Sequence, residues 1–262
     1  MTGTANYSNY ETMTFERTEG VLTVRFNRPE AFNAVNRQLH TELARVFAEI
    51  RTDTETRAVV LTGEGRAFSA GGDLKNITEG AGARLDRTFT EARKIVLDLL
   101  ELPQPIISAV NGPAMGLGAT IALLCDVVFA SDRAQFGDPH VRIGVGAGDG
   151  SIVIWPWLIG INRAKQYLMT GDAMSAEKAE RLGLVNELVP HDELIASAQT
   201  FAKRLADGPQ RAIRGTKDVL NKILRDNANL VLDPSLLMEK ECFASGDHHA
   251  PIAAFLARQK SA

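Results

Sequence analysis

The chain has 262 residues, of which 45% are hydrophobic and 23% charged, and its formal net charge is −3. This composition is typical of a globular protein and excludes a disordered or fibrous chain. A nucleic-acid-binding protein usually carries a basic excess, so we expect no nucleic-acid partner.

Two cysteines, Cys125 and Cys242, lie far apart and form no CxxC motif. This usage suits a reducing compartment, so we expect a cytoplasmic protein without a disulfide framework. The longest apolar runs, 119–125 and 152–161, are shorter than the roughly 20 residues that span a bilayer, and we expect no membrane partner. The five histidines form no HxH or HxxxH pair, so we expect no metal site.

Strands and helices alternate along the first two thirds of the sequence. Apolar and polar residues alternate over 13–17 and 21–27, on either side of Gly20, which predicts a hairpin. Apolar residues at helical spacing predict helices over 36–50, 85–102 and 115–125, and short apolar runs predict strands over 58–62, 105–110, 127–130, 134–136 and 184–189.

The pattern changes towards the C-terminus. From 192 to 259 it is helical throughout, with a break at Asp207-Gly208-Pro209. Strands alternating with helices, followed by helices alone, predict an α/β core over residues 1–206 and a helical region over residues 207–262. In that region Leu220, Ile223 and Leu224 form an apolar face for contact with other copies.

Two glycine-rich loops each follow a predicted strand. They read AFSAGGDLK over 67–75 and NGPAMGLGAT over 111–120. Glycine lets a ligand approach the backbone closely, and N–H groups at a helix start favour negative charge. Neither a complete GxGxxG nucleotide motif nor a GK[ST] motif is present. The loops could therefore aim two N–H groups at one oxygen, or they could be plain turns.

Five segments together resemble the crotonase family of enoyl-CoA hydratases and isomerases, and they cover nearly the whole chain. The resemblance implies a spiral of ββα repeats with a C-terminal helical region that packs homotrimers, often paired as hexamers. It also implies an acyl-CoA substrate, with no cofactor beyond its coenzyme A moiety. The segments are NRPEAFNAVN (27–36), AFSAGGDLK (67–75), NGPAMGLGATIALLCDVVFASDRAQFGDP (111–139), LMTGDAMSAEKAERLGLVNELVP (168–190) and FLARQK (255–260).

The resemblance also assigns roles to residues. The backbone N–H groups of Gly72 and Leu117 would form an oxyanion hole that stabilises an enolate. The coenzyme A moiety would contact the segment 28–34, the first glycine-rich loop and the C-terminal end. The residues implied are Arg28, Ala31, Ala34, Ala70, Gly71, Asp73, Leu74, Lys75 and Lys260.

Both glutamates of the family hydratases are replaced. Thr120 stands at the first position, and its hydroxyl is no general base. His140 stands at the second, after Asp138-Pro139. A flexible glycine-rich loop could fold Asp149 back onto His140 as a base–orienter pair. Asp149 could instead cap a helix beginning near Ser151, and His140 could be a structural histidine.

Three functions follow as alternatives. The first is a hydratase or isomerase acting on an acyl-CoA through an enolate, and the second is a C–C bond hydrolase of β-dicarbonyl compounds that uses His140 and Asp149. The third is an acyl-CoA-binding protein without activity. Phe89, Ile95 and Trp155 are candidates for an acyl pocket. We expect Glu239 to be a surface charge, and the alternative is that its carboxylate enters the site from the C-terminal helices.

Overall fold

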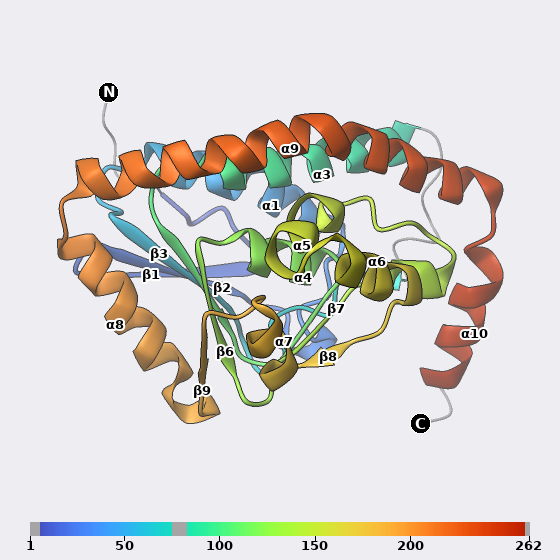
Figure 1. The fold of residues 1–262 in the computed structure, drawn as a ribbon, viewed down its shortest axis with the longest axis horizontal. Coiled ribbons are helices and arrows are strands. Elements are labelled where there is room, and N and C mark those ends of the chain that lie inside the picture. Colours follow the sequence, from blue (N-terminus) through green and yellow to red (C-terminus); the bar gives the residue numbers. More distant parts are fainter. Residues whose placement is uncertain (1–5, 75–82, 260–262) are drawn as a thin grey trace.

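The computed structural model describes residues 6–74 and 83–259, and its largest sheet has six strands (Figure 1). The strands are β1 (Met13–Thr18), β2 (Val21–Phe26), β3 (Ala58–Gly63), β4 (Ile106–Val110), β6 (Val127–Ser131) and β9 (Glu187–Val189), adjacent in that order. The predicted hairpin is confirmed as β1 and β2, which pair antiparallel, whereas all later neighbours are parallel. The parallel strands require crossover connections, which the helices supply.

A smaller sheet combines β5 (Pro113–Met115), β7 (Gln135–Gly137) and β8 (Met174–Ser175). The strand predicted over 134–136 is confirmed as β7, but the sequence reading did not predict β5 or β8. β5 begins at Pro113 and lies between two glycines, and β8 has only two residues, so neither contains an apolar run that marks a strand. β5 matters for the site because it leads directly into the helix that begins at Leu117.

Both faces of the large sheet are covered, which explains why its strands read as apolar runs rather than alternating ones. In β3, Val59 and Leu61 join the core formed with α1 and α3, whereas Ala58 and Val60 face the opposite core, formed with α8. The helices are α1 (Arg37–Thr52), α3 (Ala83–Leu100), α4 (Leu117–Leu124), α5 (Ser151–Ile159), α6 (Ile161–Thr170), α7 (Ala176–Leu182), α8 (Leu194–Asp207), α9 (Gln210–Ser245) and α10 (His249–Gln259).

Three short 3-10 helices complete the fold: η1 (Pro29–Ala31), η2 (His140–Ile143) and η3 (His191–Glu193). The tail predicted from 192 to 259 is confirmed as helical, with its break before Gln210. Among the described residues, no helix is both long and apolar enough to cross a membrane.

Polar side chains attach the long helix α9 to the rest of the molecule, which it crosses along one side in Figure 1. Lys217 Nζ donates to the backbone oxygen of Gln104 at 2.8 Å and pairs with Asp126 at 2.7 Å. Asn221 donates to the backbone oxygen of Leu100 at 2.8 Å. These buried bonds fix the register of α9 on the core, and so place the residues of its second half.

Candidate active site

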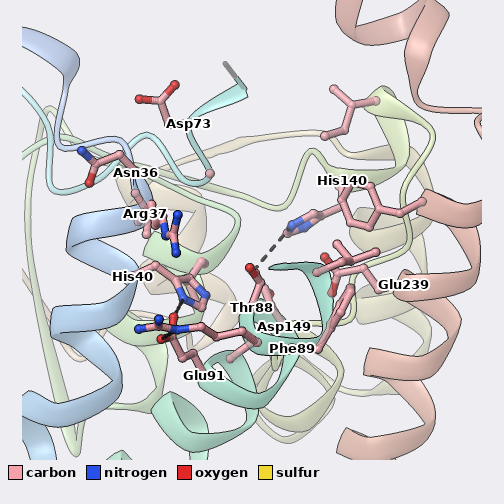
Figure 2. Close-up of a pocket in the computed structure, with 18 residues that line it drawn as sticks. Asn36, Arg37, His40, Asp73, Thr88, Phe89, Glu91, His140, Asp149 and Glu239 are labelled. Carbon is pink, nitrogen blue, oxygen red and sulfur yellow. Dashed lines mark hydrogen bonds and ion pairs between the residues drawn. The ribbon is translucent and has the colours of Figure 1, made fainter. Parts of the chain in front are cut away.

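One cavity of about 150 Å³ lies where α1, α3, the start of α4, η2 and α9 meet (Figure 2). Both glycine-rich loops reach it, through Gly72 and Leu117, and so do the two candidate acid–base residues His140 and Asp149. Apolar side chains supply much of the remaining wall. The other lining residues are Val35, Asn36, Arg37, His40, Asp73, Leu85, Arg87, Thr88, Phe89, Glu91, Ala92, Ile143, Glu239 and Phe243.

Tight backbone contacts bring the two loops together. Gly71 has a φ of +82°, and a Cβ there would lie 2.7 Å from the backbone oxygen of Met115, so only glycine fits. Gly72 bridges to Val35, while Leu117 is the first residue of α4, after Gly116 with a φ of +50°. Within the described residues, no hydrogen bond occupies the N–H of Gly72 or of Leu117. Both amides are therefore available to a ligand.

His140 lies between two carboxylates. Its Nδ1 is 2.5 Å from Asp138 Oδ1, and its Nε2 is 3.6 Å from Asp149 Oδ2. Figure 2 shows the ring of His140 directed towards Asp149. The ligand atoms of all three residues lie within 4.8 Å of one another, a spacing seen in metal sites. A single ion could bind only one ring nitrogen, whereas here each nitrogen faces its own carboxylate, an arrangement suited to proton sharing.

Two hydroxyl groups hold the carboxylates in place. Thr120 donates to Asp149 Oδ1 at 3.3 Å and lies 3.0 Å from the Ser151 hydroxyl. Ser151 in turn donates to the second oxygen of Asp138. Asp149 does not cap α5, whose N-cap is Gly150 without a side-chain bond. Thr120 is thus part of the same hydrogen-bonded network as Asp149.

Burial and charge set the protonation of this cluster. Burial lowers the pKa of His140, but Asp138 and Asp149 outweigh it and raise the pKa well above its ordinary value. Burial would raise the pKa of Asp138, yet the charge and hydrogen bond of His140 lower it below its usual range. Burial raises the pKa of Asp149 to about 6 against the charge of His140. At neutral pH, His140 is therefore a cation flanked by two carboxylates that are mainly ionised.

Glu239 enters the cavity from α9, contrary to the expected surface position. Its side chain is buried, and its Oε2 has no hydrogen-bond partner in the described part of the molecule. Burial, reinforced by the charges of Asp149 and Asp138, raises the pKa of Glu239 to about 8, so at neutral pH it is mainly a neutral acid. The helical region thus contributes a residue to the site.

The remaining predicted site residues are those assigned to coenzyme A, and the structure describes all of them except the two lysines. Arg28 precedes η1 as its N-cap, donates to the backbone oxygen of Ala34 and lies 3.6 Å from Asp73. Ala70 donates its N–H to the backbone oxygen of Phe32 at 2.9 Å. The two segments assigned to coenzyme A, including Ala31, Gly71 and Leu74, are therefore adjacent. Lys75 and Lys260 lie outside the described residues.

Of the three acyl-pocket candidates, one lines the cavity and two do not. Phe89 lines the cavity, whereas Ile95 and Trp155 are fully buried in the core. Sequence reasoning missed Asp138 as a partner of His140, and it missed His40 and Glu91. A signal for Glu239 exists, because Leu232, Ser235, Leu236 and Glu239 share one helical stripe, which α9 buries.

Comparison with known proteins agrees with this geometry. The family model described as enoyl-CoA hydratase/isomerase matches residues 16–262. The chain belongs to this family, the crotonases. It is 34% identical to a short-chain-enoyl-CoA hydratase of Clostridium acetobutylicum, over 94% of both chains. It is also 32% identical to a 1,2-epoxyphenylacetyl-CoA isomerase of Escherichia coli, over 92% of this chain and 94% of that one.

A solved structure shows the same crotonase fold. The enoyl-CoA hydratase/isomerase of Mycobacterium paratuberculosis superposes with a TM-score of 0.90 at 37% identity, covering 94% of this chain and 99% of that one. The resemblance inferred from sequence motifs and the expected fold class are thereby confirmed. The chain is a member of an enzyme family whose relatives include enoyl-CoA hydratases and an acyl-CoA isomerase, and His140 and Asp149 line its own cavity.

Proposed function

We propose that this crotonase acts on an acyl-CoA thioester through an enolate, with Gly72 and Leu117 as the oxyanion hole and with His140 and Asp149 as the acid–base pair. One observation carries the proposal: the two available amides and the His140 cluster lie around the same cavity. A thioester carbonyl placed at the amides would bring its α-carbon into reach of the cluster. Losing one such amide typically costs about 10²–10³ in rate.

We assign the base role to Asp149 and the acid role to His140. An imidazolium between two carboxylates has no free lone pair to accept a proton, whereas Asp149 with a pKa of about 6 is mainly ionised at neutral pH. Asp149 would take a proton from the substrate or from a water molecule. His140 would then give its Nε2 proton to the carbon of the enolate, and both residues would reset by exchange with solvent.

The same groups support hydration or isomerisation, as in the family relatives. Because Thr120 and His140 replace the two family glutamates, we expect hydration of crotonyl-CoA to be weak. Proton transfer between two carbons of the acyl chain needs only one base and one acid on one wall, which the pair supplies.

The second candidate is C–C bond hydrolysis of a β-dicarbonyl substrate. The neutral carboxyl group of Glu239 favours it, because a buried acid without a partner can donate a hydrogen bond to a second carbonyl oxygen. In this reaction Asp149 takes a proton from water, and the hydroxide adds to that carbonyl. The bond to the α-carbon then breaks, and its electron pair forms the enolate held at Gly72 and Leu117.

We further propose a homotrimer or a dimer of trimers. Two of the three predicted contact residues of α9 support this, since Leu220 is 60% exposed and Ile223 is 50% exposed, while Leu224 packs on the core. Leu230 and Leu237 on the same helix are also exposed.

A panel of saturated, 2-enoyl, 3-enoyl and 3-oxoacyl-CoA thioesters, assayed by mass spectrometry in D2O, tests the proposal. Water addition raises the substrate mass by that of a whole D2O molecule. Isomerisation only replaces hydrogen by deuterium, and hydrolysis yields two shorter products. His140→Asn and Asp149→Asn should each lower the rate by about 10²–10⁴. Asp172→Asn, which alters an exposed partner of Arg142, is the control. Binding of acyl-CoA without product or deuterium exchange would support a binding protein and refute the enzyme.

A further inference from the structure

A second histidine–carboxylate pair lines the cavity, on a different wall from His140. His40 of α1 and Glu91 of α3 both line it, and the Nδ1 of His40 is 2.9 Å from Glu91 Oε2. Figure 2 shows this pair on the side of α1, with His140 and Glu239 on the far side and Asp149 between them. The cavity thus presents imidazole rings to a substrate from two sides.

Three side chains hydrogen-bond to the carboxylate of Glu91. Besides His40, it accepts hydrogen bonds from the Thr41 hydroxyl at 3.2 Å and from Arg87 Nε at 2.8 Å. Burial tends to raise the pKa of Glu91, but the bonds from His40 and Arg87 hold it at about 2. Its carboxylate is therefore ionised throughout the physiological range and fixes the orientation of the His40 ring.

This orientation leaves one nitrogen of His40 for the cavity. Because Glu91 takes Nδ1, the ring carries its second nitrogen, Nε2, on the opposite edge, and no hydrogen bond to Nε2 occurs within the described residues. A histidine with one nitrogen fixed by a carboxylate and the other directed at a substrate is the arrangement of a general acid or base. The charge of His40 also acts on Asp149, which it helps to keep ionised.

We propose that His40 is a second catalytic acid of this pocket, positioned by Glu91 and acting on the opposite side of the substrate from His140. The inference rests on the proposed enolate chemistry. When Asp149 has removed one proton, an Nε2–H group of His40 gives its proton to the substrate atom at which negative charge remains. The electron pair of that N–H bond stays on Nε2. Solvent then returns a proton to His40, and Asp149 releases one.

Variants of the two helices test this role. His40→Gly should lower kcat by about 10²–10³ while KM changes less than threefold, and added imidazole should restore at least a tenth of the lost rate. Glu91→Gln should lower kcat by about tenfold, because the ring keeps its chemistry but loses its orientation. Arg51→Gln is the matched control: it removes an exposed ion pair between α1 and Glu101, the residue after α3, away from the cavity, and it should retain wild-type kcat.

The outcomes separate this inference from the proposed function. If His140→Asn abolishes turnover while His40→Gly remains within threefold of wild type, His40 is a structural contact and the inference is wrong. If His40→Gly is inactive but imidazole restores nothing and its unfolding midpoint falls well below that of Arg51→Gln, the pair only joins two helices. If neither histidine variant changes the wild-type rate, the proposed enolate chemistry itself fails.

Discussion

The hydroxyl of Thr120, on α4, donates a hydrogen bond to Asp149 Oδ1 at 3.3 Å, from a position that is fully buried. The bond stabilises the ionised carboxylate, so it lowers a pKa that burial raises to about 6. Thr120, which cannot itself act as a base, thereby lowers the pKa of Asp149, the proposed base. The same helix begins at Leu117, so the proposed oxyanion donor and the hydroxyl that lowers the pKa of Asp149 lie on one element.

Thr120→Val should move the acid limb of the pH–rate profile upwards by about one unit, because the lost bond favoured the charged form of Asp149. Activity at pH 6 should fall more than activity at pH 8. Thr120→Ser keeps the hydroxyl and should keep the wild-type profile. An unchanged acid limb in the valine variant would show that Asp149 is not the base.

Two glycines of the loops should be irreplaceable for activity. In Gly116→Ala, the new Cβ would lie 3.2 Å from Cε1 of His140, at a φ of +50°. In Gly71→Ala, it would lie 2.7 Å from the backbone oxygen of Met115. We expect kcat to fall by about 10²–10³ in both, since the amides of Gly72 and Leu117 would move.

Gly160→Ala separates backbone strain from damage to the site. Gly160 has a φ of +80°, but a Cβ there would meet no atom within 4 Å. All three alanine variants should lose about 1–3 kcal/mol of unfolding free energy in urea titrations. Only the first two should lose activity at temperatures at which they remain folded. A comparable loss of kcat in Gly160→Ala would contradict the specific role of the loops.

Much of the fold follows from the sequence because its strands are buried on both faces. A run such as Ala58–Gly63 must be apolar at every position when cores lie on both sides, and this makes the strand visible without any structure. The strands β5 and β8 form through tertiary pairing of two or three residues, and no local pattern marks them.

The site was less predictable than the fold, for a physical reason. The two glycine-rich loops can be recognised from the sequence, because their local backbone conformation requires glycine. The partners of His140 depend on long-range packing: Asp138 is near in sequence, but Glu239 arrives from α9. The protonation of Asp149 and Glu239 depends on burial, which a single sequence shows only through the helical stripe of α9.

Exposed apolar residues on α9 should hold the oligomer together. Leu220→Lys combined with Ile223→Lys should convert a trimer or hexamer into a monomer, because charged side chains disfavour a buried apolar interface. Multi-angle light scattering at micromolar concentration measures the mass directly. Met169→Lys, on α6 and 70% exposed, is the control and should leave the mass unchanged. A monomeric wild-type protein would refute the proposal.

Glu239 should make the protein less stable as the pH rises. In the unfolded chain its pKa is 4.5, and in the folded protein it is about 8. Between these values the folded state holds a proton that the unfolded state has released. The stability contribution is therefore fully present below pH 4.5, falls as pH rises, and is lost once pH passes about 8.

Glu239→Gln removes this titration while keeping a side chain of similar shape. The variant should match the wild type near pH 4.5 and exceed its unfolding free energy at pH 8 by roughly 2–4 kcal/mol, because it does not have to bury a charge. Urea titrations at both pH values give the difference. Glu241→Gln is the control on the same helix, where the side chain is exposed, and should show no pH-dependent gain. If Glu239→Gln gains nothing at pH 8, the carboxyl group ionises without cost in the folded protein, and it cannot serve as the neutral donor that C–C bond hydrolysis requires.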